Sequence, residues 1–144
     1  GDFQQLLVIR KMCNDLCMPI DIVGVATVRE IDGLAMSSRN NYLSSEERSV
    51  APRLHRILQD YRDAIANGFD NYRHLERHAR EDLVLEGFQP DYVNILDSET
   101  LGEVTPDTES LVILAAARLG KTRLIDNVSL TLNPSTDWGM LAAN

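Results

Sequence analysis

A run of small and polar residues near the front of the chain has the types and spacing needed to hold a polyphosphate. Ser37, Ser38 and Arg39 stand together shortly after Gly33. Backbone N–H groups around two serines can form an anion-binding concavity, and a guanidinium can clamp phosphate oxygens with two parallel hydrogen bonds. Serines are also common in ordinary turns, so the segment alone is weak evidence. It favours an enzyme that handles ATP.

The composition is that of a globular protein with an acidic balance. The chain has 144 residues and a formal net charge of −8, and nonspecific nucleic-acid binding instead needs a basic face. No apolar run of about 18 residues is present, so no membrane-spanning helix is expected. Cys13 and Cys17 lie one helical turn apart, which favours reduced thiols in a cytoplasmic protein over a disulfide framework.

The first part of the chain reads as a helix followed by a strand. Residues 2–17 carry apolar side chains at the spacing of one helix face, and Asp2 and Gln5 form a variant of the capping box. Residues 20–25 are rich in β-branched side chains, as in a strand covered on both faces. A helix followed closely by such a strand is half of a doubly wound unit, so these residues are expected to be a piece of a larger domain.

Two helices are expected to follow the serine-and-arginine segment. Ser44 and Glu47 have the spacing of a capping box, and the apolar pattern beyond them continues to Gly68. Pro52 lies within that pattern, which predicts a kink or two abutting helices near residue 51. His55, beside the apolar stripe, is interpreted as a packing or surface residue. A further helix is expected from residue 70 or 71 to Gly87.

Three short segments then have the composition of strands, with Gly120 and Lys121 as a tight turn before the last of them. These segments are Tyr92–Leu96, Leu111–Ala116 and Thr122–Asp126. Helices followed by strands predict an α+β fold with a mostly antiparallel sheet over residues 45–128. Residues 29–44 are then a loop and hinge with a short turn, and residues 129–144 a loose tail.

Two groups of ionisable residues have more than one interpretation. Arg29 and Glu30 form either a solvated pair at a strand end or, through Arg29, a means of orienting the loop by pairing with a carboxylate. His74 and His78 stand four residues apart, with Asp82 one helical turn further on, a spacing that can bind zinc. No second cluster of histidine or cysteine accompanies them, so a solvated polar helix face is favoured.

Three stretches of the chain resemble one enzyme family. They are Asp2-Phe3-Gln4-Gln5, the run 22–43 that includes Met36-Ser37-Ser38-Arg39, and the ending 116–127. Together they resemble the pantothenate synthetase (pantoate–β-alanine ligase) family over residues 2–128. The resemblance is to the C-terminal half of that family only.

The resemblance implies an activity and a fold. The family joins pantoate and β-alanine with ATP. Pantoate attacks the α-phosphate to give a pantoyl adenylate and pyrophosphate, and the amine of β-alanine then displaces AMP. In the family, a Rossmann-type nucleotidyltransferase domain precedes a small α+β lid. By this resemblance, residues 1–28 would be the last helix and strand of the nucleotide-binding Rossmann-type domain, and residues 45–128 the lid. The Met-Ser-Ser-Arg stretch within residues 29–44 would be the family's version of the phosphate-binding KMSKS loop.

The resemblance also implies roles for individual residues. Asp2 would hydrogen-bond the ATP ribose, Gln5 would hold pantoate, and the backbone near Val28 and Met36 would face adenine. The residues expected to bind the phosphates and act in catalysis are Ser37, Ser38 and Arg39. Mg²⁺ would be carried mainly by the phosphates, with no metal ligands assigned in the protein.

The chain departs from the family pattern in ways that suggest a fragment. Gly1 stands where the family usually has a lysine before Asp2, and no His-x-Gly-His motif is present. Ala26 replaces a common proline. We expect the natural gene to begin earlier and this chain to be inactive alone.

Two further hypotheses remain from the sequence. The chain could act chiefly as an association module, because a strand and helix without their partner sheet invite pairing with another copy. We would then expect a homo-oligomer such as a dimer formed by exchange of residues 2–28. Alternatively, the chain could belong to another adenylyl-transferring synthetase, with Gln5 as the residue that discriminates the acid.

Overall fold

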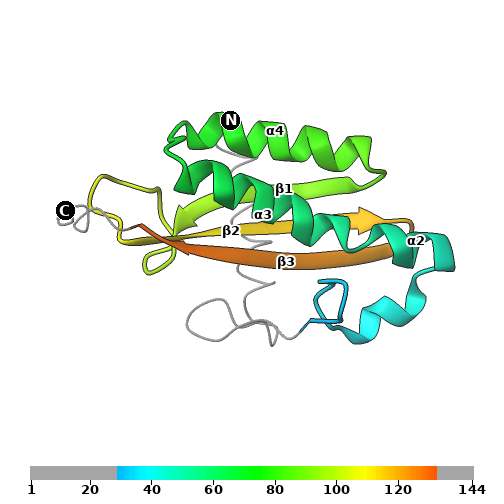
Figure 1. Cartoon of the computed structure of the whole chain (residues 1–144). Coiled ribbons are helices and arrows are strands. Elements are labelled where there is room, and N and C mark those ends of the chain that lie inside the picture. Colours follow the sequence, from blue (N-terminus) through cyan, green and yellow to red (C-terminus); the bar gives the residue numbers. More distant parts are fainter. Residues whose placement is uncertain (1–28, 133–144) are drawn as a thin grey trace.

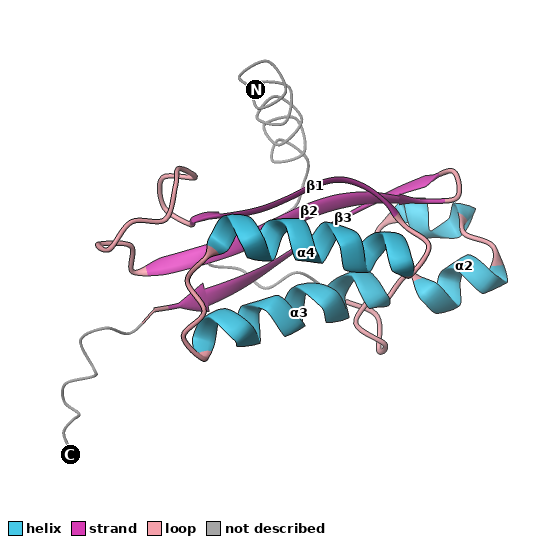
Figure 2. Ribbon diagram, turned by 90° about the horizontal axis from the view of Figure 1, so that it is seen from above, coloured by secondary structure: helices cyan, strands magenta, loops and turns pink. Residues whose placement is uncertain are grey.

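The computed structural model describes residues 29–132, which form helices on one face of an antiparallel sheet (Figure 1). α3 (Arg53–Ala66) and α4 (Tyr72–Leu85) lie side by side, and Figure 2 shows both on the same side of the sheet. This arrangement confirms the predicted α+β class. The helix and strand predicted within residues 1–28, and the Rossmann-type domain they imply, lie outside the described residues.

The sheet has three strands in the order β1-β2-β3, and both neighbouring pairs are antiparallel. The strands are β1 (Gln89–Asp97), β2 (Ser110–Leu119) and β3 (Thr122–Thr131). α4 packs against β1 and α3 against β3. All three predicted strands are present, but each is longer than predicted. β3 continues beyond the expected domain boundary at residue 128, because its last residues pair with the start of β2.

The helices begin and end where their capping residues predicted. Ser44 and Glu47 form the expected capping box at the start of α2 (Ser45–Val50). Pro52 separates α2 from α3, which confirms the predicted break near residue 51. Asn71 caps α4 through its side chain, and Gly87 follows that helix with φ +98°. None of the described helices is long and apolar enough to cross a membrane.

The main core lies between the helices and the sheet. Every second residue of the central strand β2 points into it, and Leu54, Leu58 and Leu83 approach from the helices. Other residues of β2 belong to a second apolar cluster with Tyr92. A central strand that is buried on both faces holds its neighbours firmly. It therefore gives β3 a fixed position from which side chains can reach the loop.

The β2–β3 turn depends on a glycine in two ways. Gly120 has φ +63°, a conformation that glycine adopts without strain. A Cβ at this position would also lie 2.0 Å from Oε2 of Glu47, the residue that caps α2. The turn and the start of α2 are therefore in close contact, and α2 is fixed against the end of the sheet.

Candidate functional site

The loop that carries the serine-and-arginine segment is more ordered than predicted. Its front, residues 29–35, folds back on itself with a backbone hydrogen bond of 2.8 Å from the Glu30 N–H to the Leu34 carbonyl. Gly33, at φ +95°, allows this reversal, and a Cβ there would lie 3.1 Å from the His55 ring. The short turn predicted within residues 29–44 is a 3-10 helix, η1 (Ser38–Tyr42), which packs beside β3.

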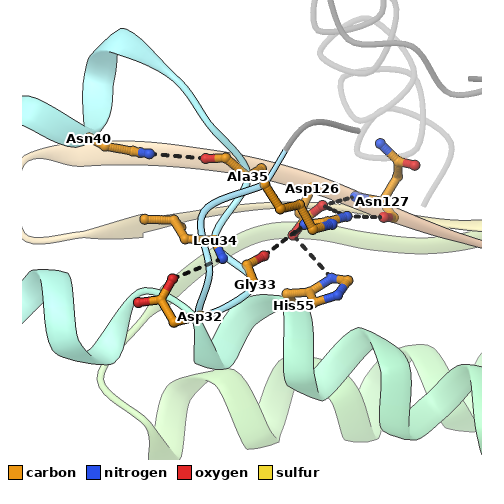
Figure 3. A network of polar contacts seen from close by, with 9 residues as sticks. Asp32, Gly33, Leu34, Ala35, Asn40, His55, Asp126 and Asn127 are labelled. Atoms are coloured by element: carbon orange, nitrogen blue, oxygen red, sulfur yellow. Dashed lines mark hydrogen bonds and ion pairs between the residues drawn. The ribbon is translucent and has the colours of Figure 1, made fainter. Parts of the chain in front are cut away.

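Arg29 fastens this turn to the sheet. Its guanidinium donates two hydrogen bonds of 2.8 Å to the two carboxylate oxygens of Asp126 on β3. It also donates to the carbonyls of Gly33 at 3.0 Å and Asn127 at 3.1 Å. Figure 3 shows Asp126 and Asn127 beside the turn that holds Gly33. The interpretation that Arg29 orients the loop through a carboxylate is confirmed, and the solvated-pair alternative is wrong.

Two further contacts hold the same turn. Leu34 is buried in the main core, so the turn has an apolar anchor. Arg48 of α2 donates to Asp32 at 2.6 and 3.2 Å. This hydrogen-bonded contact lowers the pKa of Asp32 and raises the pKa of Arg48. The turn is thus tied to β3, to the core and to α2.

The predicted phosphate-binding residues follow directly after this anchored turn. Ser37 is extended, with φ −161° and ψ 147°, and caps η1 by accepting the Arg39 N–H on its hydroxyl at 3.1 Å. The Asn40 N–H donates to the Ser37 carbonyl at 3.1 Å, and the Asn40 side chain donates to the Ala35 carbonyl at 3.0 Å. A phosphate that binds the Arg39 N–H must therefore replace the Ser37 hydroxyl, an exchange of one oxygen acceptor for another.

The structure places only part of the predicted site. Met36, exposed at the surface, and Ser37 are followed without a break by Ser38 and Arg39 at the start of η1. The other predicted ligands, Asp2, Gln5 and Val28, lie outside the described residues. Within the described part, the predicted residues lie together because they are adjacent in sequence, and the backbone on either side of them is held by the contacts of Arg29 and Asn40.

Sequence reasoning missed two residues of this region. Asp126 was predicted only as the end of a strand, and His55 only as a packing or surface residue. His55 lies against Gly33, and its Nδ1 is 3.6 Å from Asp126 Oδ2. A usable signal for Asp126 was its place as the one carboxylate of a predicted strand, because buried charges are rarely left unpaired.

The histidines of α4 do not group with Asp82. The rings of His74 and His78 lie 4.4 Å apart, whereas the Asp82 carboxylate accepts a hydrogen bond from Tyr61 of α3 at 2.5 Å. Within residues 29–132, no three side chains of His, Cys, Asp or Glu are grouped closely enough to hold a metal ion. The polar-face interpretation is therefore favoured over zinc for these three residues.

Comparison with known proteins assigns the chain to a family. Residues 1–129 match the family model described as pantoate-beta-alanine ligase. The chain belongs to this family. This confirms the resemblance inferred from the sequence motifs.

Individual relatives agree with the family match and show its extent. The chain is 52% identical over 130 residues to the pantothenate synthetase of Marinobacter nauticus, covering 90% of this chain and 46% of that protein. It is 53% identical over 129 residues to the pantothenate synthetase of Chromobacterium violaceum, covering 90% of this chain and 47% of the relative. The chain thus spans about half the length of the curated relatives it matches.

A solved structure gives the same answer for the fold. The crystal structure of pantothenate synthetase from Thermus thermophilus aligns with a TM-score of 0.64 and 43% sequence identity. The alignment covers 88% of this chain and 46% of that one. The described α+β unit is therefore an arrangement shared with this family.

Proposed function

We propose that this chain is the phosphate-gripping half of a pantothenate synthetase, with Ser37, Ser38 and Arg39 binding the phosphates of MgATP. The single observation that carries the proposal is the anchored turn in a member of this family. The turn that directly precedes these residues is held at Arg29, Asp32 and Leu34, so the segment that follows starts from a fixed position. Preorganised donors of this kind stabilise charge that develops during a reaction.

The proposed chemistry needs that stabilisation at one place. When the pantoate carboxylate attacks the α-phosphorus of ATP, the bond to the bridging oxygen breaks and its electron pair leaves with pyrophosphate. Arg39 and the backbone N–H groups beside it would meet the charge on that leaving group. The β-alanine amine then attacks the adenylate carbonyl and AMP leaves. Pantoate and ATP are both anionic, so positioned cations also offset their repulsion.

A full-length chimaera tests this function. Residues 1–129 replace the matching 46% of the Marinobacter nauticus pantothenate synthetase. We expect the chimaera to form pantothenate from pantoate, β-alanine and MgATP, with release of pyrophosphate. We expect the 144-residue chain alone to show none of this activity, since it spans about half of such a protein.

A double variant tests the residues. In the chimaera, Ser38→Ala with Arg39→Ala should lower kcat/KM for ATP by about 100-fold or more, as loss of transition-state donors does. The matched control is Arg56→Ala with Ser129→Ala, which removes the same two side-chain types from exposed positions outside the loop. Unchanged kinetics in the loop variant would overturn the proposal. Pyrophosphate release that depends on another acid and not on pantoate would assign the chain to a different synthetase.

A further inference from the structure

The guanidinium of Arg29 joins two segments that are far apart in the sequence, its own turn and β3. It reaches Asp126 and Asn127 on β3, and the Gly33 carbonyl within its own turn. A planar guanidinium in a two-pronged contact fixes orientation as well as distance. Any movement of β3 relative to the turn must break or bend these hydrogen bonds. The contact therefore sets the position of the turn against the sheet.

His55 supports the same contact from α3. Its Nδ1 is buried, has no hydrogen-bond partner among the described residues and lies 3.6 Å from Asp126 Oδ2. Its ring also occupies the space next to Gly33. Figure 3 shows His55 directed toward Asp126, with Gly33 close by. His55 thus blocks movement of Asp126 and of the turn toward the helix.

The placement of these residues connects them to the phosphate loop. Arg29 forms an isolated strand bridge with Ala35, whose carbonyl accepts the Asn40 side chain. Ser37, Ser38 and Arg39 lie between these two fixed points in sequence. A shift of Arg29 would therefore also move Ser37–Arg39, the segment proposed to bind the phosphates. Misplacement of a catalytic group by about 1 Å can lower the rate by about 100-fold.

We infer that Arg29 and Asp126, supported by His55, are positioning residues that hold Ser37–Arg39 in the geometry required for adenylyl transfer. The inference rests on the proposed function of that segment and goes beyond it, because none of the three positioning residues is required to touch substrate. A buried ion pair is weak evidence for a purely stabilising role, because apolar replacements are often as stable. The two-pronged contact of Arg29 with Asp126 instead fixes orientation.

The experiment uses the full-length chimaera with Arg29→Lys and, separately, Asp126→Asn. Arg29→Lys keeps the charge and the aliphatic stem but loses the two-pronged contact, so it carries the test if Asp126→Asn fails to fold. The matched control is Asp91→Asn, which breaks the 2.8 Å ion pair between Arg123 of β3 and Asp91 of β1. All variants are assayed well below the lowest of their melting temperatures, so that each is folded.

We expect both variants to lower kcat for pantoate-dependent pyrophosphate release by about 100-fold, while KM for β-alanine stays within a factor of about three. Amide hydrogen exchange at residues 37–40 should speed up in both, and not in Asp91→Asn. If the pair were purely structural, the two substitutions would lower the melting temperature but leave kcat of the folded enzyme unchanged. That result would overturn the inference. If Ser38→Ala with Arg39→Ala is itself fully active, the proposed function has failed. If only that double variant is impaired, the positioning role alone has failed.

Discussion

Two arginine–aspartate pairs fasten the same turn, and they differ mainly in their surroundings. Arg29 and Asp126 are 2.8 Å apart with side chains 19% and 3% exposed, whereas Arg48 and Asp32 are 2.6 Å apart with side chains 34% and 46% exposed. The shorter contact is the more hydrated one. Water screens the exposed charges and solvates them if the pair breaks, but it cannot do the same for Asp126. We therefore expect burial, and not contact length, to decide which pair contributes more to the free energy of unfolding.

The largest expected effect comes from removing the buried carboxylate. Asp126→Ala should lower the free energy of unfolding by about 3 kcal/mol, because Arg29 is left with its charge uncompensated. Chemical denaturation measures the loss. Asp32→Ala is the matched comparison at the exposed pair. Equal losses in the two variants would contradict the importance of burial, and a double-mutant cycle with Arg29→Ala would show whether the coupling is direct.

The apolar anchor of the turn is expected to rank next. Leu34→Ala should cost about 2.5 kcal/mol, since it leaves a cavity in the main core. Ile31→Ala is the control within the same turn, because Ile31 is fully exposed and its loss should change stability by less than about 0.5 kcal/mol. Thermal and urea unfolding of both variants provide the measurement. A comparable loss at Ile31 would mean that the turn is not held through Leu34.

Gly120→Ala should lower the free energy of unfolding by about 2 kcal/mol. It also affects the exposed pair Arg48–Asp32, through α2. The substitution strains a residue at φ +63° and pushes the Glu47 carboxylate away from the start of α2, which carries Arg48. Gly68→Ala separates the two causes, because Gly68 has positive φ but open space around it. Unfolding midpoints should fall further for Gly120→Ala. If the two variants fall equally, the contact with Glu47 contributes nothing.

The exposed pair should show the smallest effect. Arg48→Gln is expected to cost less than about 1 kcal/mol, and much of that should vanish in about 1 M salt. The folded-state pKa of Asp32 is lowered, so its contribution is present above the unfolded pKa, about 3.9, and disappears as pH falls through the folded value. Stability of the wild type and Arg48→Gln from about pH 7 to about pH 2 should therefore converge. A gap that persists at the acid end would contradict this assignment.

The sequence was sufficient to predict the ends of those helices that carry strong local signals. The capping box at Ser44, the break at Pro52 and the glycine stop at Gly87 are each set by neighbouring residues. Strand ends were predicted too short, because pairing across the sheet and not local composition extends β3 to Thr131. The order within residues 29–44 was also underestimated, since its contacts come from distant segments.

The same reasoning explains what was found of the candidate site. Ser37, Ser38 and Arg39 are adjacent, so a pattern in the sequence can propose them, and their role as phosphate ligands stays a prediction. Asp126 is 97 residues from Arg29. Its place as the one carboxylate of a predicted strand marks it as a residue that needs a partner, but nothing local shows that the partner is Arg29. The sequence did offer a carboxylate partner as one role for Arg29, but it could not say which carboxylate. Only the folded sheet supplies that answer.

The 97-residue separation of Arg29 and Asp126 has a consequence for synthesis. A ribosome that has translated the chain as far as Gly120 has made every residue of the loop 29–44, but it has not yet made β3, to which Arg29 binds. Contacts this distant in sequence close late, after nearby ones have formed. We therefore expect the turn that precedes Ser37 to gain its fixed position only when β3 has emerged, and any product that stops short of Asp126 to lack this anchor.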